Sequence, residues 1–191
     1  MGGNAFEKYE DYIAYLTAKE LRIEKLLSQG WKLNLGQKLG STYQVLNPQM
    51  PNSLNARYAE WKIWFEKIIP LLDDTVAFIG HSLGGIFLAK YLSENTYPKK
   101  IRATFLIAAP YNTKDQHPLV DFIITEDLSL FAQQAGEVFL YQSTDDMVVP
   151  FENVTSYQKA LPNAQIRIFK DKQHFNQEEF PELIADIITL N

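Results

Sequence analysis

A serine stands at the centre of the stretch with the clearest chemical meaning in this chain. The turn Gly80-His81-Ser82-Leu83-Gly84-Gly85 follows the apolar run Thr75–Ile79 and precedes Ile86–Leu92, whose composition predicts a helix. A Gly-x-Ser-x-Gly turn between a strand and a helix is the context of a nucleophile elbow, which exposes the serine Oγ at the end of the strand. Glycines two positions either side of Ser82 remove Cβ atoms that would clash in so tight a turn. The motif therefore predicts a nucleophile at Ser82, and a glycine-rich turn with a solvated serine is the alternative.

Two carboxylates and a histidine follow strand-like runs later in the chain. Asp145 and Asp146 come after Val138–Ser143, and His174 comes after Gln165–Phe169. The order Ser, Asp, His along the chain is the order of α/β-hydrolases and differs from that of other serine hydrolases. Open α/β sheets place their ligand crevices at the carboxyl ends of the strands, so we expect these side chains to meet there.

The chemistry of acyl transfer needs these three residue types. A serine hydroxyl is a weak nucleophile until a base takes its proton, and imidazole titrates near the working pH. A carboxylate fixes the tautomer of that histidine and stabilises its charged form. Peptide N–H groups stabilise the oxyanion, and we expect the Leu83 N–H to be one of them. We expect His81, inside the turn, to pack or contact backbone, and His117, in a polar loop, to be solvated.

The chain resembles a known family in several further motifs. It is similar to the small α/β-hydrolases of the retinoblastoma-binding-protein-nine-like group, which are single-domain serine hydrolases. The resemblance rests on Met50-Pro51-Asn52, Tyr58–Trp61, Gly80–Gly85, Asp145-Asp146, His174-Phe175 and the segment Glu179–Ile184.

By this resemblance, Ser82, Asp146 and His174 carry over as a catalytic triad. The family spacing of acid, three residues and proline matches Asp146 with Pro150, so Asp145 is expected to be a turn residue that bonds nearby backbone. The binding partner in the family name is not carried over, because the Leu-x-Cys-x-Glu motif needs a cysteine and this chain has none.

Composition narrows the class of protein. A chain of 191 residues predicts one domain, residues 1–191, with a core large enough for a five- or six-stranded sheet. A formal net charge of −5 argues against nucleic acid or an anionic membrane as partner. No apolar run is long enough to span a membrane, and no signal peptide is evident. The absence of cysteine removes disulfides and thiolate metal sites, which suits a cytoplasmic protein, and no cofactor or metal is expected.

Strand-like and helix-like runs alternate along the chain, which predicts an α/β fold with a mostly parallel sheet, helices on both faces and no large lid. Expected strands are Tyr43–Leu46, Thr75–Ile79, Arg102–Ala108, Glu137–Gln142 and Gln165–Phe169; expected helices are Tyr9–Gln29, Asn55–Leu72, Leu83–Ser93, Asn153–Leu161 and Phe180–Thr189. Trp31–Gly40 stays ambiguous. Apolar residues in the segment 119–131 are expected to cover the sheet, or alternatively to wall an acyl pocket.

The N-terminus departs from the family pattern. Family members begin with an apolar strand that leads into a glycine turn, and this turn supplies the second oxyanion N–H. Here Gly2-Gly3-Asn4 resembles that turn, yet only Met1 precedes it. By resemblance, that strand would lie between Tyr43–Leu46 and Thr75–Ile79. We therefore expect either a truncated form of a longer protein or a replacement strand such as Trp31–Leu35, with Gly3 or Asn4 as the second oxyanion donor.

Together these features predict a serine hydrolase that cleaves a small ester through an acyl-Ser82 intermediate, with a small-molecule acyl substrate as its partner. Thioester or amide hydrolysis on the same triad is one alternative. A binding protein that keeps the fold without useful catalysis is another.

Overall fold

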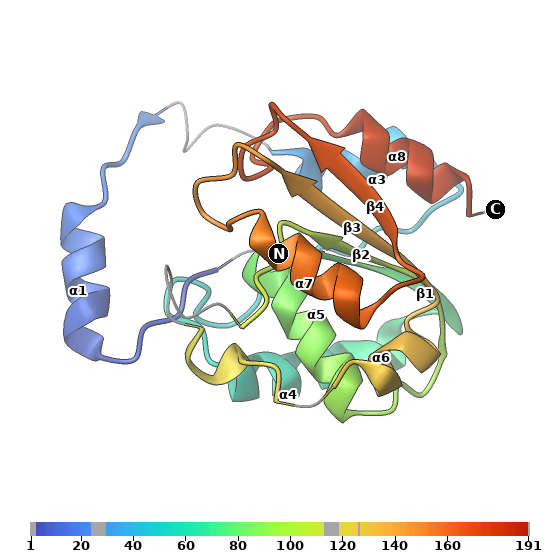
Figure 1. The fold of residues 1–191 in the computed structure, drawn as a ribbon, viewed down its shortest axis with the longest axis horizontal. Helices are drawn as coiled ribbons and strands as arrows, with labels where there is room; N and C mark the ends of the chain where they lie inside the picture. Colours follow the sequence, from blue (N-terminus) through green and yellow to red (C-terminus); the bar gives the residue numbers. More distant parts are fainter. Residues whose placement is uncertain (1–2, 24–29, 113–118, 126, 191) are drawn as a thin grey trace. The chain divides into compact units, whose positions relative to one another are not determined.

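Four parallel strands form one sheet in the order β1-β2-β3-β4 (Figure 1). In this computed structural model they are β1 (Thr75–His81), β2 (Lys100–Ile107), β3 (Glu137–Ser143) and β4 (Gln165–Phe169). The description covers residues 3–23, 30–112, 119–125 and 127–190. These residues fall into two compact units, one drawn from 1–7 and 49–175 and the other from 8–48 and 176–191. The sheet belongs to the first unit.

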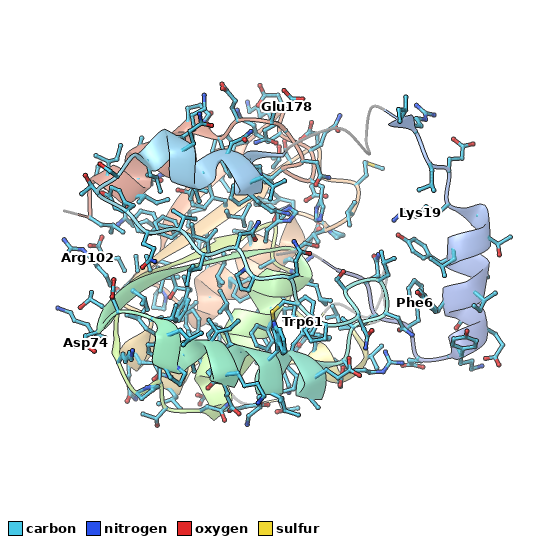
Figure 2. The ribbon with its side chains drawn as sticks, turned by 180° about the vertical axis from the view of Figure 1, so that it is seen from behind. Phe6, Lys19, Trp61, Asp74, Arg102 and Glu178 are labelled. Carbon is cyan, nitrogen blue, oxygen red and sulfur yellow. The ribbon has the colours of Figure 1, made fainter. Side chains whose placement is uncertain are left out.

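The register of the sheet brings the carboxyl ends of its strands to one edge. His81 pairs with Ile107, Ile107 with Tyr141, and Ser143 with Phe169. The opposite edge carries Asp74 and Arg102, near the amino ends of β1 and β2 (Figure 2). The segments that follow the strands therefore start close together, as the alternating sequence pattern predicts.

The strands β2 and β3 are almost wholly buried over their last five residues. They consist there of apolar and aromatic side chains with Thr104, Gln142 and Ser143 as the polar exceptions. Near-continuous burial is the pattern of central strands in parallel sheets, because both faces are covered.

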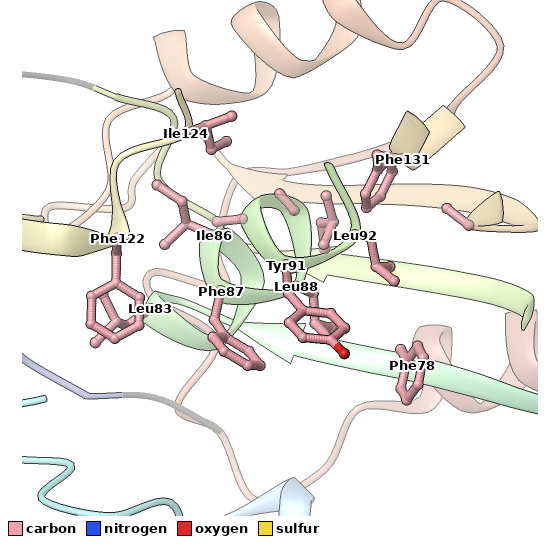
Figure 3. Packing of buried hydrophobic residues seen from close by; sticks show 14 of the residues in the cluster. Phe78, Leu83, Ile86, Phe87, Leu88, Tyr91, Leu92, Phe122, Ile124 and Phe131 are labelled. Carbon is pink, nitrogen blue, oxygen red and sulfur yellow. The ribbon is translucent and has the colours of Figure 1, made fainter. Parts of the chain in front are cut away.

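The first unit also contains the helices α4 (Tyr58–Ile68), α5 (Leu83–Glu94), α6 (Ser129–Gln134) and α7 (Glu152–Ala160), with short 3-10 turns η1 (Ile69–Leu71) and η2 (Val120–Phe122). Their inward side chains share one hydrophobic cluster with the strands. The helix α5 is buried along nearly its whole length, and Figure 3 shows its side chains packed between Phe78, Phe122 and Phe131. Trp61 of α4 lies inside this cluster with no exposed surface (Figure 2).

The second unit contains α1 (Tyr9–Ala18), α3 (Trp31–Leu39) and α8 (Pro181–Ile188). The helices α3 and α8 pack together through Trp31 and Phe180, whose rings meet edge to face at 5.5 Å. The N–H of Trp31 donates to the carbonyl of Gln177 at 3.1 Å, which fixes the start of α3. The helix expected over Tyr9–Gln29 ends at Ala18, and residues 24–29 lie outside the described residues.

One expected strand and one alternative replacement strand are not formed. Tyr43–Leu46 is irregular, and Trp31–Leu35 is the first half of α3. Trp31 and Leu35 are four residues apart and bury one face of that helix, so helical periodicity decided this segment. A short run such as Tyr43–Leu46 forms a strand only where a partner supplies ladder hydrogen bonds, and none pairs with it in the described ranges.

The sheet accordingly has four strands among the described residues, where five or six were expected, and β1 lies at its edge. Restriction of the whole chain to one domain stays a prediction. In the part of the chain that the structure describes, no helix is long and apolar enough to cross a membrane.

Candidate active site

Ser82 occupies a strained turn between β1 and α5. Its backbone has φ 55° and ψ −127°, a conformation that non-glycine residues avoid and that costs on the order of 1–3 kcal/mol. The Ser82 N–H donates to the Ile107 carbonyl at 2.9 Å, and the Ser82 carbonyl accepts from the Gly85 N–H at 2.8 Å. These bonds hold the serine at the carboxyl end of β1 and at the N-cap of α5. Strand, elbow and helix follow one another as the motif predicts.

The glycines of the elbow permit this close packing. A Cβ atom at Gly80 would lie 2.5 Å from the Gly84 carbonyl oxygen. A Cβ atom at Gly85 would lie 2.5 Å from the Cβ of Ala109, in the segment that follows β2. Both distances are too short for any real side chain, so glycine at these two positions is a steric requirement of the turn.

Asp146 lies buried in the loop after β3. Its side chain has no exposed surface, and its Oδ1 accepts the N–H groups of Val148 at 2.8 Å and Val149 at 3.0 Å. Its Oδ2 accepts from Gln142 Nε2 at 3.4 Å. These three donors replace the water that burial removes from the two carboxylate oxygens.

His174 meets Asp146 in the loop after β4. The distance from His174 Nδ1 to Asp146 Oδ2 is 2.9 Å, and the histidine side chain is 12 % exposed. Since a carboxylate accepts, Nδ1 carries the proton of this bond, and in the neutral ring Nε2 is then left as the proton acceptor.

The described residues show no hydrogen bond between the Ser82 hydroxyl and the His174 ring. The structure therefore shows the bond between Asp146 and His174 but no bond between His174 and Ser82. Catalytic hydrogen bonds are often long before a substrate binds. The geometry is therefore compatible with Ser82 as a nucleophile and His174 as its base.

The loop that carries His174 is itself strained. Gln173 has φ 47° and Phe175 has φ 51°, so residues with side chains adopt left-handed backbone on both sides of the histidine. Phe175 has no exposed surface and packs edge to face on Phe169 at 5.6 Å. Backbone of this kind persists only where surrounding contacts determine it.

Asp145 supplies one of those contacts. Its Oδ1 accepts from the Gln173 N–H at 2.9 Å and from the Ser143 hydroxyl, while the Lys172 N–H donates to Ser143 Oγ at 3.1 Å. The Ser143 hydroxyl, together with the Gln173 backbone, holds the pKa of Asp145 below its usual value. Asp145 bonds nearby backbone, as expected of a turn residue. The sequence analysis did not identify Ser143 and Gln142 as partners of the two aspartates. Their polar side chains at the end of a buried strand were the signal that could have identified them.

Two backbone segments meet near the elbow as possible oxyanion donors. Leu83 is the first residue of α5, where N–H groups have no partner within the helix. A Cβ atom at Gly3 would lie 3.3 Å from Leu83 Cδ2 and 2.7 Å from the Ser53 carbonyl oxygen, so Gly3 packs directly against the residue after the nucleophile. The Asn4 N–H already donates to the Ser53 carbonyl at 2.9 Å. Asn4 and Gly3 were the two expected donors in this segment. The bond to Ser53 engages the N–H of Asn4 and not that of Gly3.

The other histidines fall in different places. His81 is buried, 2 % exposed, and its Nε2 lies 2.8 Å from the carbonyl oxygen of His174, which confirms the expected backbone contact. His117 lies outside the described residues. In the described ranges, no group of three or more His, Asp or Glu side chains is arranged to hold a metal ion.

Comparisons with known proteins identify the family and the fold of this chain. The family described as serine hydrolase matches residues 27–182, and the chain belongs to that family. The predicted resemblance to small serine hydrolases of the α/β-hydrolase fold is therefore confirmed. The comparison with curated protein sequences gives no match.

Solved structures with the same fold are distant in sequence. The ydeN gene product of B. subtilis aligns with a TM-score of 0.65 at 17% identity, over 75% of this chain and 80% of that one. The meta-cleavage product hydrolase of Pseudomonas fluorescens aligns with a TM-score of 0.63 at 14% identity, over 81% of each. An esterase from Exiguobacterium antarcticum aligns with a TM-score of 0.55 at 14% identity, over 73% of this chain and 77% of that one. These similarities establish the predicted α/β-hydrolase fold.

Proposed function

We propose that this serine hydrolase cleaves a small carboxylic ester through an acyl-Ser82 intermediate. Ser82 is the nucleophile, His174 the general base and acid, and Asp146 the group that orients His174. The Leu83 N–H and the Gly3 N–H form the oxyanion hole. The partner is a small acyl compound. A cytoplasmic location belongs to the same proposal and is supported by the absence of cysteine.

The bond between Asp146 and His174 carries this proposal. A carboxylate with no exposed surface, bonded to Nδ1 at 2.9 Å, selects the tautomer whose Nε2 can accept a proton. A strained serine at the same edge of the sheet is the group from which that proton would come.

The acylation step follows from these positions. The Ser82 oxygen bonds to the ester carbonyl carbon as its proton passes to His174 Nε2, and the carbonyl oxygen becomes the oxyanion. The N–H groups of Leu83 and Gly3 donate to that oxyanion; loss of one such donor typically costs about 100- to 1,000-fold in kcat. The bond from carbon to the leaving oxygen then breaks, and His174 returns the proton to that oxygen so that an alcohol leaves.

Deacylation repeats the sequence with water. His174 Nε2 takes a proton from a water molecule whose oxygen bonds to the acyl carbon. The bond from that carbon to the Ser82 oxygen breaks, and His174 gives the proton back to Ser82. The carboxylic acid leaves and the enzyme returns to its first state. The buried carboxylate of Asp146 stabilises the His174 imidazolium that forms in both halves of the cycle.

Labelling with a fluorophosphonate tests the nucleophile. Mass spectrometry should place a single adduct on Ser82, and Ser82→Ala should abolish both the adduct and the hydrolysis of p-nitrophenyl acetate. The matched control is Ser93→Ala, which removes a buried hydroxyl that donates to the Ala89 carbonyl within α5 and should leave the Ser82 adduct in place. An adduct on another serine, with Ser82 untouched, contradicts the proposal.

Rates on three substrate classes test the bond that is cleaved. The ester proposal expects p-nitrophenyl esters to exceed the matched thioesters and anilides in kcat/KM. A higher kcat/KM for thioesters or anilides would assign the same residues to the alternative chemistry. No adduct and no turnover on any of the three would favour a binding protein that has kept the fold.

A further inference from the structure

His81 makes a contact with the backbone of His174 that the acyl-transfer steps do not use. Its ring is 2 % exposed, its Nε2 lies 2.8 Å from the His174 carbonyl oxygen, and the two imidazole rings have centroids 4.8 Å apart. His81 is the last residue of β1 and the direct neighbour of Ser82. The bond therefore spans 93 positions of sequence and joins the elbow to the loop that carries the base.

The chemistry of the acceptor assigns the proton in this bond. A carbonyl oxygen only accepts, so His81 Nε2 must carry a hydrogen and donate it. The Nε2 atom of His81 is thus a hydrogen-bond donor, whereas the Nε2 atom of neutral His174 is a proton acceptor. His81 cannot serve as the base while it makes this bond. The His81 ring therefore contributes to the site by fixing the His174 carbonyl in place, and not by transferring a proton.

The bonded carbonyl belongs to the peptide between His174 and Phe175. Holding that oxygen fixes ψ of His174 and φ of Phe175, and the latter is one of the two left-handed angles in the loop, at 51°. On the other side, Asp145 holds the Gln173 N–H at 2.9 Å. The strained loop is therefore restrained from both sides, by Asp145 in the turn after β3 and by His81 at the end of β1.

We propose that His81 is a positioning residue: its Nε2–H clamps the His174 backbone and so sets the distance from the base to Ser82. This inference rests on the proposed function, because it assigns His174 as the base. It predicts that loss of the clamp lowers kcat while KM stays unchanged, since the clamp touches no part of the substrate. A displacement of about 1 Å in a catalytic group can cost on the order of 100-fold in rate.

Two amide substitutions of different reach provide the test. The nitrogen of His81→Gln can occupy nearly the position of Nε2 and still donate, whereas the nitrogen of His81→Asn stops near the position of Nδ1. We expect His81→Gln to keep kcat for p-nitrophenyl acetate within about threefold and His81→Asn to lose about 10- to 100-fold. The rate of fluorophosphonate labelling at Ser82 should fall in parallel, and KM should not change in either variant.

Equal kcat in wild type and His81→Asn overturns the clamp, and so does equal impairment of both variants. Nitrogen NMR of 15N-histidine-labelled wild-type protein gives a second measurement that needs no variant to fold. It should show His81 protonated at Nε2, and an Nδ1–H tautomer there overturns the inference. Failure of the proposed function is recognised separately, because wild-type protein would then not label at Ser82 at all.

Discussion

Asp146 Oδ2 lies 2.9 Å from His174 Nδ1, in a position where the aspartate side chain has no contact with solvent. Its immediate neighbour Asp145 points to other partners, the Ser143 hydroxyl and the Gln173 N–H. Two adjacent carboxylates after one strand therefore have separate tasks. One meets the ring of the histidine, and the other holds the backbone of the same loop.

Replacement of each aspartate by asparagine gives a matched pair. Asp146→Asn should lower kcat by about 10,000-fold, because an amide at this position favours the wrong tautomer of His174. Asp145→Asn should lower kcat far less, since it removes charge from a loop bond and leaves the His174 partner intact. Steady-state rates with p-nitrophenyl acetate decide the matter, and the reverse ranking of the two variants refutes the assignment.

Gly80→Ala should disrupt the elbow. The new Cβ would stand 2.5 Å from the Gly84 carbonyl oxygen, so the turn must open and Ser82 must move. We expect a loss of roughly 1–3 kcal/mol in the free energy of unfolding and a fall in labelling at Ser82. Gly30→Ala is the control, because the one contact its Cβ would make with the described residues is to the Gln177 carbonyl oxygen, at 3.8 Å. Equal unfolding midpoints and equal labelling for the two variants would show that the elbow tolerates a side chain.

Short acyl chains should be preferred over long ones. In the segment between β2 and β3, Phe122 and Phe131 have no exposed surface and Leu128 is 3 % exposed, all within the core cluster. These side chains cover the fold as expected and are not free to wall a pocket. Each methylene buried in a wall is worth only about 0.8 kcal/mol, and these three core side chains offer no such wall to a long acyl chain.

The measurement is kcat/KM for p-nitrophenyl esters from acetate to dodecanoate. We expect kcat/KM to be highest for the acyl chains of two to about four carbons and to decline beyond them. A value that climbs steadily with chain length would mean that other segments supply an apolar wall.

Glu94 should stabilise the protein in a pH-dependent way. Its carboxylate accepts from Lys90 Nζ at 2.6 Å and from the Tyr58 hydroxyl at 2.8 Å. Partial burial alone would raise the pKa of Glu94, but these bonds outweigh it and the pKa is lowered. A lowered pKa means that the folded state binds fewer protons, so the stabilisation is present above the ordinary glutamate pKa of about 4.3 and is lost as the pH falls through the folded value.

Glu94→Gln should therefore cost about 1–2 kcal/mol of unfolding free energy at pH 7, with a difference from wild type that shrinks below about pH 4. Urea unfolding of both proteins at pH 7 and at pH 3.5 measures this difference in unfolding free energy. Glu20→Gln is the control, since the Glu20–Arg22 pair is exposed and worth little. A Glu94→Gln effect that is as large at pH 3.5 as at pH 7 would show that the carboxylate charge is not the cause.

The local stereochemistry of the elbow could be predicted from sequence alone. The turn around Ser82 needs glycine at fixed offsets, and the apolar runs before and after it predict β1 and α5 without knowledge of any distant contact. The buried runs of β2 and β3 are equally local, because apolar strands of this length indicate burial on both faces. The fold class followed from these features together with the order of Ser82, Asp146 and His174. The family followed from the resemblance of further motifs, among them His174-Phe175 and Glu179–Ile184.

Segments whose structure depends on partners were decided only by the tertiary structure. Tyr43–Leu46 has strand-like composition but joins no sheet among the described residues, and Trp31–Leu35 became helical because Trp31 and Leu35 bury one helix face. The contact between Asp146 and His174 joins residues 28 positions apart, and that between His81 and His174 joins residues 93 apart. Sequence determined which residues could do chemistry, because their types and local turns are fixed along the chain. Only the tertiary structure decided which of them touch, because those contacts depend on how separate strands end at one edge of the sheet.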